Sequence, residues 1–252
     1  MWEILDTGVR SAVVNMQIDS DLLDNIGERQ TPLIHFYEWE GDSATYGYFV
    51  KPESLLDLGV AEERSLVLAR RSTGGGIVFH LWDMAFSVLV PSHCAEFSMN
   101  TLDNYAFVNG AVLGAVEQFF EKKEELSLIP EDALSKDMHC KYFCMAKPTK
   151  YDVMWQGRKI AGAAQRKTRG GFLHQGTISL VMPSQEYLSA ILLPGTEVIA
   201  AMGVFTHPLL GKNATRGEME GAKERLRKLL ATHLNEASLK CAKVKTEGIY
   251  VG

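Results

Sequence analysis

The sequence contains no long apolar run, and this absence argues against a membrane protein. A helix that crosses a bilayer needs about 18 or more mainly apolar residues in succession, and no such run occurs in the chain. The N-terminus, with Met1, Trp2, Glu3 and Asp6, also lacks the basic region and apolar stretch of a secretory signal. We therefore expect no membrane partner and a cytoplasmic location.

The sequence also has few cysteines and no excess of basic residues. The four cysteines, Cys94, Cys140, Cys144 and Cys241, show no Cys-x-x-Cys pair or other familiar zinc spacing. We expect free thiols in a reducing compartment and no metal site. Lysine and arginine number 26 against 31 aspartates and glutamates, a net charge of −5. This balance argues against nucleic acid as the main partner, although a local basic cluster can still bind a small anion.

Apolar residues are abundant, at 46% of 252 residues, which is enough for one large core. No internal repeat or low-complexity linker divides the chain, so we expect a single domain over residues 1–252. Apolar spacing predicts helices at residues 11–26, 102–122 and 218–234, and strands at residues 33–39, 44–49, 66–69, 77–80, 85–90, 151–155, 157–162 and 177–181. The strands at 33–39 and 44–49 are expected to form a hairpin, and residues 121–137 a loop or a frayed helix end. The pattern indicates an α+β fold with a largely antiparallel sheet flanked by helices.

The sharpest local feature is the run RRSTGGGIVFH at residues 70–80. Three consecutive glycines let the backbone approach a ligand closely, and the preceding arginines offer charged donors to an anion. A carboxylate or phosphate group would bind naturally there. The alternative is a plain hairpin turn with exposed arginines, and the spacing matches neither the P-loop nor the dinucleotide-binding fingerprint.

A second feature is the run GRKIAGAAQRKTRGGFLHQGT at residues 157–177. Lys159 is expected on a strand beside small residues, from which its ammonium group can project into a pocket and stabilise a developing oxyanion. Arg166, Lys167 and Arg169 are expected to form a basic mobile loop. The alternative is a solvated hairpin with no chemical role.

With both features in view, the chain resembles the family of lipoate-protein ligase A and the octanoyltransferases, whose fold is shared with the biotin/lipoate protein ligase catalytic domain. The resemblance covers nearly the whole chain, and its most specific parts are RR-x-TGGG-x-V-x-H at residues 70–80 and G-x-K-x-x-G-x-AQ at residues 157–165. Only about 70 residues follow Val181, so a separate C-terminal accessory domain is not expected.

The resemblance also implies site residues. The positions that would bind the acyl group or acyl-adenylate are Arg71, Gly74, Gly75, Gly76, Val78, His80, Gly162, Ala164 and His174, with Lys159 as the catalytic cation near the reacting carboxyl group. For His80 we favour a hydrogen-bonded support role over general-base catalysis. His174 is expected on the basic loop, and its role is open, because Gln175 separates it from the Gly-Thr pair that it adjoins in many relatives.

Two chemistries divide this family. In the ligases, ATP with Mg²⁺ activates lipoic acid as an acyl-adenylate, which a lysine of the carrier protein then attacks. In one branch of octanoyltransferases, a cysteine accepts the acyl group from acyl carrier protein as a thioester, and no cofactor is needed. In both cases the resemblance implies that the acyl acceptor is a lipoyl domain of a 2-oxoacid dehydrogenase or the glycine-cleavage H protein.

Cys144 is the position that separates the two chemistries. It lies four residues before Pro148-Thr149 and fifteen before Lys159, which resembles the transferase pattern, although a free cysteine is often only a small buried apolar residue. His80 is followed by residues 81–84, LWDM, where the ligases usually have Asp-x-Gly-Asn. The three glycines, in contrast, are closer to the ligases.

The more extensive glycine motif favours the ligase narrowly, with the octanoyltransferase as the alternative. The second alternative is a non-catalytic acyl-binding relative.

Overall fold

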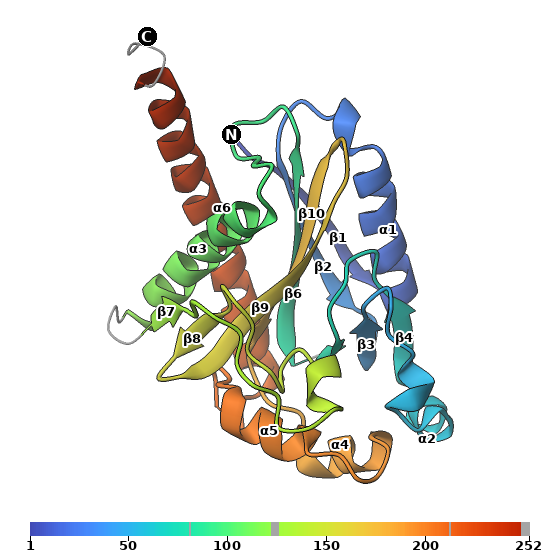
Figure 1. The fold of residues 1–252 in the computed structure, drawn as a ribbon. Helices are drawn as coiled ribbons and strands as arrows, with labels where there is room; N and C mark the ends of the chain where they lie inside the picture. Colours follow the sequence, from blue (N-terminus) through green and yellow to red (C-terminus); the bar gives the residue numbers. More distant parts are fainter. Residues whose placement is uncertain (81, 122–125, 212, 248–252) are drawn as a thin grey trace.

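The computed structural model describes residues 1–80, 82–121, 126–211 and 213–247, which form two sheets with helices around them (Figure 1). The strands are β1 (Glu3–Arg10), β2 (Leu33–Trp39), β3 (Ser43–Tyr46), β4 (Val67–Arg70), β5 (Ile77–His80), β6 (Asp83–Pro91), β7 (Leu126–Leu128), β8 (Val153–Trp155), β9 (Arg158–Lys167) and β10 (Gly171–Ser179). The α-helices are α1 (Ala12–Asp24), α2 (Leu58–Glu63), α3 (Thr101–Phe120), α4 (Gln185–Ile191), α5 (Val198–Phe205) and α6 (Arg216–Glu247). Short 3-10 turns occupy Ile26–Glu28, Pro52–Ser54 and Cys140–Tyr142.

The larger sheet has seven strands in the order β1-β2-β6-β10-β9-β8-β7. Its β1–β2 pair is parallel, and its other neighbouring pairs are antiparallel. The predicted fold class, an α+β architecture with a largely antiparallel sheet flanked by helices, is confirmed.

Helices cover both faces of this sheet (Figure 1). The amphipathic helices α3 and α6 pack on one face, where Val112 and Leu230 meet Phe86 and Ile178 in the main apolar core. Helix α1 lies on the opposite face, with the Ser11 hydroxyl accepting a hydrogen bond from the Val14 N–H at its N-terminus. The burial of these apolar side chains is the main force that fixes the helices on the sheet.

The smaller sheet has three strands in the order β4-β3-β5 and a second apolar core of its own. Ile77 and Phe79 of β5 pack there against Phe143, from the segment before β8, and Met202 of α5. This arrangement sets β3 and β5 opposite the interior strands β9 and β10 of the larger sheet. The space between the two sheets holds the candidate site.

The predicted hairpin of residues 33–39 and 44–49 is wrong. Both strands exist, but β2 pairs with β1 and β6 in the larger sheet, whereas β3 pairs with β4 and β5 in the smaller one. The strand β1 was not expected, because it lies at a sheet edge and most of its side chains are exposed or half-buried. Apolar alternation is weak in such a strand, so periodicity gives little signal.

Other boundaries also shift. Arg166 and Lys167 belong to β9 and not to a mobile loop, and α6 extends well beyond its predicted end. The expected loop at residues 121–137 contains β7, while its residues 122–125 lie outside the described part of the chain. None of the described helices is long and apolar enough to cross a membrane. The single-domain organisation stays a prediction.

Candidate active site

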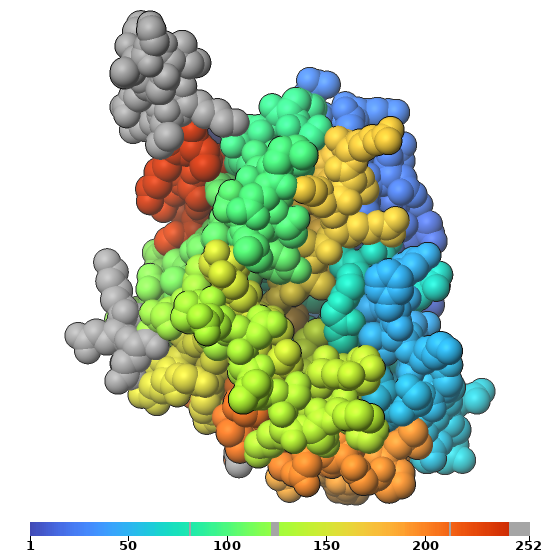
Figure 2. Space-filling model, viewed as in Figure 1, coloured from blue at the N-terminus to red at the C-terminus, as the bar shows by residue number. Residues whose placement is uncertain are grey.

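A cavity lies between the two sheets. Its walls come from β3 and β5 on one side, from β9 and β10 on the other, and from α1 and the segment that carries Cys144. Among the residues predicted for the site, those that line it are Arg71, Val78, His80, Cys144, Gly162 and Ala164. In Figure 2 the surfaces of these segments, in blue to teal, yellow-green and yellow, meet on one face of the molecule.

The glycine turn, which we define as residues 71–76, is held together by the buried side chain of Arg71. Its guanidinium group donates to the Thr45 hydroxyl at 2.7 Å and to the carbonyl oxygens of Gly74 at 3.1 Å and Gly76 at 2.7 Å. Burial lowers the pKa of Arg71, and the negative charge of a Cys144 thiolate opposes that shift. Arg71 therefore has both a structural role and a position beside the sulfur.

Cys144 is half-buried, and its sulfur faces this turn. The Gly76 N–H donates to Sγ at 3.3 Å, and the Cys144 N–H donates to the Ile77 carbonyl at 3.1 Å. A Cβ atom on Gly75 would lie 3.6 Å from Sγ and 3.5 Å from the Cβ of Ala164. The backbone N–H and the Arg71 guanidinium are groups that stabilise negative charge on a sulfur or an oxyanion.

Lys159 does not line the cavity. Its ammonium group forms a buried ion pair with Asp152 at 2.7 Å and donates to the Cys144 carbonyl at 2.8 Å. Asp152 also accepts a hydrogen bond from the Thr149 N–H at 2.6 Å. Burial raises the pKa of Asp152 overall, although Lys159 and Thr149 favour its ionised form. The structure thus places Lys159 behind the segment that carries the Cys144 sulfur.

Gly162 is required at its position by this ion pair. A Cβ atom there would lie 2.4 Å from Lys159 Nζ and 2.6 Å from Asp152 Oδ1. Any larger residue would push the pair apart, because both partners are buried and have no free space to occupy. The motif glycine therefore makes room for protein atoms and not only for a ligand.

His80 uses both ring nitrogens within the protein. Nε2 lies 2.8 Å from the Thr45 hydroxyl, Nδ1 lies 2.8 Å from Asp83 Oδ2, and the ring stacks on Trp39 with centroids 4.0 Å apart. Burial tends to raise the pKa of Asp83, but His80 and the Thr177 hydroxyl outweigh it and lower the pKa. This geometry fits the support role that we favoured for His80.

His174 is not on a loop, contrary to our expectation. It lies in the middle of β10 and stacks against Phe86 on the core side, whereas its neighbours Gln175 and Thr177 line the cavity. Burial lowers the pKa of His174 to about 3, so the ring is neutral near neutral pH. Its Nδ1 atom lies 2.7 Å from Gln165 Nε2. His174 therefore supports the sheet and does not face the cavity.

Several polar side chains around the cavity were not predicted as site residues from the sequence. Gln175 accepts from the Thr73 hydroxyl at 2.7 Å and donates to Asp19 at 2.6 Å, while Asp19 also lies 2.8 Å from the buried His35 ring. This chain of contacts connects the glycine turn to α1 and β2. One signal was available for Asp152, since a buried lysine needs a counter-charge and Asp152 is the nearby acid in sequence.

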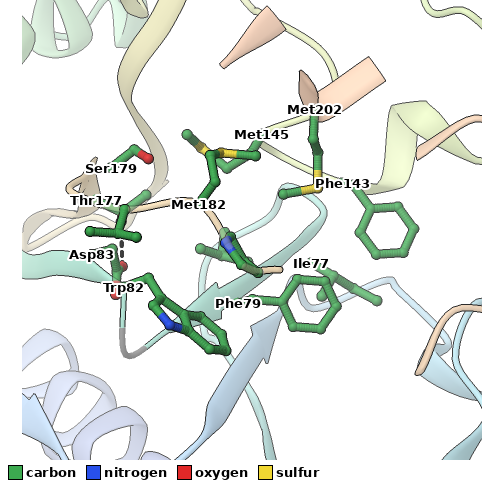
Figure 3. Close-up of a pocket in the computed structure, with 13 residues that line it drawn as sticks. Ile77, Phe79, Trp82, Asp83, Phe143, Met145, Thr177, Ser179, Met182 and Met202 are labelled. Carbon is green, nitrogen blue, oxygen red and sulfur yellow. Dashed lines mark hydrogen bonds between the residues drawn. The ribbon is translucent and has the colours of Figure 1, made fainter. Parts of the chain in front are cut away.

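A second, apolar cavity adjoins the first and shares Val78 and Thr177 with it. Figure 3 shows the methionine side chains on one side and the rings of Trp82 and Phe79 on the other. The methionines are Met145, Met182 and Met202. Asp83 is the charged group in its lining, and no lysine, arginine or histidine is among the described residues that line it. In the part of the chain that the structure describes, no three His, Cys, Asp or Glu side chains gather as metal ligands would.

Comparison with known proteins gives consistent results. The family described as "Lipoyl protein ligase A/B catalytic domain" matches residues 11–206. Octanoyltransferase LipM of Staphylococcus aureus is 28% identical over 179 residues, which are 70% of this chain and 65% of that relative. Octanoyltransferase LipM of Geobacillus kaustophilus is 30% identical over 210 residues, which are 79% of this chain and 72% of that relative.

The fold is also similar to solved structures. One is a bipartite lipoate protein ligase of Thermoplasma acidophilum, studied with its E2 lipoyl domain, with a TM-score of 0.62. Its sequence identity is 20%, and the match covers 94% of this chain and 90% of that chain. At this identity the similarity supports the fold and leaves the reaction to be inferred from the site.

Proposed function

Because the chain belongs to the family of the lipoyl protein ligase A/B catalytic domain, we propose that it is an octanoyltransferase acting through a thioester on Cys144. The sequence alone narrowly favoured the ATP-dependent ligase. The octanoyltransferase relatives, at 28 and 30% identity, favour the transferase instead. The position of the Cys144 sulfur in the cavity, 3.3 Å from the Gly76 N–H, is the observation that carries the proposal.

The reaction has two acyl transfers. The Cys144 thiolate attacks the thioester carbonyl of the octanoyl donor, the carbon–sulfur bond of the donor breaks, and the donor leaves as a thiol after taking up a proton. The lysine amine of the carrier domain then attacks octanoyl-Cys144, which forms an amide and returns the cysteine, and the proton lost by the amine balances the one taken up earlier. The Gly76 N–H and Arg71 stabilise the negative charge that develops in each step.

Lys159 acts in this scheme through the backbone. Its ammonium group donates to the Cys144 carbonyl and is itself held by Asp152, so the pair fixes the position of Cys144 relative to the glycine turn. It is a positioning residue, because the segment around Cys144 has little regular structure of its own to hold it.

The charges around the two cavities also favour a reaction without ATP. Among the described lining residues, the basic side chains are Arg71 and His80, and both form hydrogen bonds with protein groups. The apolar cavity carries the carboxylate of Asp83, which repels phosphate. A nucleoside triphosphate would need further cations there.

The acyl acceptor in this proposal is a lipoyl domain of a 2-oxoacid dehydrogenase or the glycine-cleavage H protein, and the donor is octanoyl-acyl carrier protein. We propose a cytoplasmic location, where the thiol stays reduced. The competing function is the ligase, which uses lipoic acid with ATP and Mg²⁺. The observation in its favour is the full RR-x-TGGG motif, of which Arg71 lines the cavity.

The test combines intact-mass measurement with a carrier-acylation assay. Octanoyl-acyl carrier protein should add one octanoyl group to the wild type, and Cys144→Ser should lose both the adduct and nearly all transfer. Cys140→Ala is the matched control, since Cys140 is buried outside the cavity and burial raises the pKa of its thiol to about 11. The ligase would be the correct function if Cys144→Ser still transferred lipoic acid in the presence of ATP, while wild type accepted no octanoyl group from acyl carrier protein.

A further inference from the structure

Two arginine side chains share one aromatic ring on the outer side of the glycine turn. The guanidinium carbon of Arg70 lies 4.7 Å from the ring centroid of Tyr48, and that of Arg166 lies 5.8 Å from it. All three side chains are exposed, and Tyr48 keeps 45% of its accessible surface. Neither arginine forms an ion pair with a carboxylate among the described residues, so two positive charges lie at one ring without an acidic partner.

Backbone contacts fix this cluster, Tyr48, Arg70 and Arg166, to the turn. The Tyr48 N–H donates to the Thr73 carbonyl at 2.9 Å, Arg166 donates to the Ser72 carbonyl at 3.3 Å, and Arg70 directly precedes the turn. On the inner side of the same turn the Gly76 N–H contacts the Cys144 sulfur. The cluster and the nucleophile are therefore attached to opposite sides of one short turn.

An anion relieves the repulsion in such a cluster. Guanidinium groups bind phosphate through paired N–H···O bonds, and stacking on a ring restricts their motion before the anion arrives. A phosphodiester offers two unesterified oxygens, one for each guanidinium group. The protein as a whole is acidic, with a net charge of −5, so this local positive charge stands out.

We propose that the cluster binds the phosphate of the phosphopantetheine arm that carries the octanoyl group on its donor. This inference rests on the proposed function, because it concerns the donor of the same acyl transfer. In the donor, the phosphate lies at one end of the arm and the thioester at the other. That order matches a phosphate on the outer side of the turn and a thioester carbon that reaches Cys144 on its inner side.

The test compares two minimal donors, octanoyl-phosphopantetheine and octanoyl-pantetheine, which differ only in the phosphate. Wild type should prefer the phosphorylated donor by at least about tenfold in kcat/KM, since a charge-assisted hydrogen bond contributes that much. Arg70→Gln and Arg166→Gln should each lower this ratio severalfold, through a higher KM for the phosphorylated donor. Octanoyl-coenzyme A and octanoyl-acyl carrier protein, which share the arm, should respond to the variants in the same direction.

Arg169→Gln is the matched control. Arg169 is exposed beside the end of β9 and does not lie over Tyr48, and its substitution removes the same charge. A ratio near one in wild type, or an equal fall with Arg169→Gln, would overturn the phosphate site. Calorimetry with unacylated phosphopantetheine and pantetheine is the second readout. If neither donor is used, the proposed function fails, while a phosphate-dependent affinity that Arg70→Gln removes would still support the site.

Discussion

The buried pair of Lys159 and Asp152 gives the sharpest prediction, because its contributions to stability and to activity can be separated. Their side chains are 3% and 2% exposed, so removal of one partner leaves the other as a buried, uncompensated charge. We expect Lys159→Met and Asp152→Leu each to lower the free energy of unfolding by about 3–5 kcal/mol. Asp152→Leu also leaves the Thr149 N–H without its carboxylate acceptor, which adds about 1–3 kcal/mol.

The double variant should behave differently. Replacement of both charges by apolar groups of similar size is often neutral, so we expect most of the lost stability to return. Acyl transfer should not return, because the Cys144 carbonyl still lacks the donor that Lys159 provided at 2.8 Å. A displaced nucleophile costs on the order of 10²-fold in rate.

Urea unfolding followed by tryptophan fluorescence measures the stability of the four proteins in this cycle, and mass detection of the octanoylated carrier measures transfer. Losses that simply add in the double variant would show that the two side chains do not act as a pair. Wild-type transfer by the folded double variant would show that the Cys144 segment does not depend on Lys159.

Three further changes probe the cavity and its supports. Gly75→Val should prevent formation of the octanoyl adduct, since Gly75 has φ +83° and its Cβ would meet the cavity wall. Gly74→Ala should still form the adduct, because a Cβ atom there has no other atom within 4 Å. Equal adduct formation in both variants would contradict this. The folded pKa of His174 is about 3, below its usual 6.5, so the unfolded state binds more protons and stability falls as pH drops below 6.5. Between pH 6.5 and 5, wild type should therefore lose about 2 kcal/mol more than His174→Phe in urea unfolding, and parallel curves would refute the assignment. Thr45→Val removes an acceptor of Arg71 and should cost about 1–3 kcal/mol in thermal unfolding, with an unchanged midpoint as the contrary result.

The sequence predicted elements best where one face is clearly apolar. Helix α1 and strands β2 and β5 lie close to their predicted positions. Apolar residues recur at helical spacing in α1, and the two strands are short, almost fully buried runs rich in apolar and aromatic residues. Strand β1 carries mostly exposed residues and was missed. The pairing of β2 with β6, and not with β3, depends on which faces the two sheets bury, and local turn residues do not encode that choice.

At the site, the sequence identified the glycine turn and the cysteine but not their supports. The family resemblance implied that both Arg71 and Cys144 belong to the site, although Gly76 and Cys144 are 68 positions apart. The sequence predicted that the ammonium group of Lys159 would project into a pocket, whereas that group faces Asp152 and does not line the cavity. It also did not predict that His174, from its position in β10, turns its side chain to the core. The direction of a side chain follows from strand register, which sequence patterns predict poorly near bulges.

The hydrogen bonds of the cavity have a consequence for synthesis of the chain. Gly76 contacts Cys144 across 68 residues, Thr73 contacts Gln175 across 102, and Gln175 contacts Asp19 across 156. Contacts of such separation form late and make folding slow. At about 5–20 residues per second, a ribosome needs a few seconds to extend the chain from Cys144 to Gln175. The nascent polypeptide therefore carries Cys144 before the walls of the cavity around it exist. In the proposed reaction, this thiol can accept an acyl group only once β10 has docked.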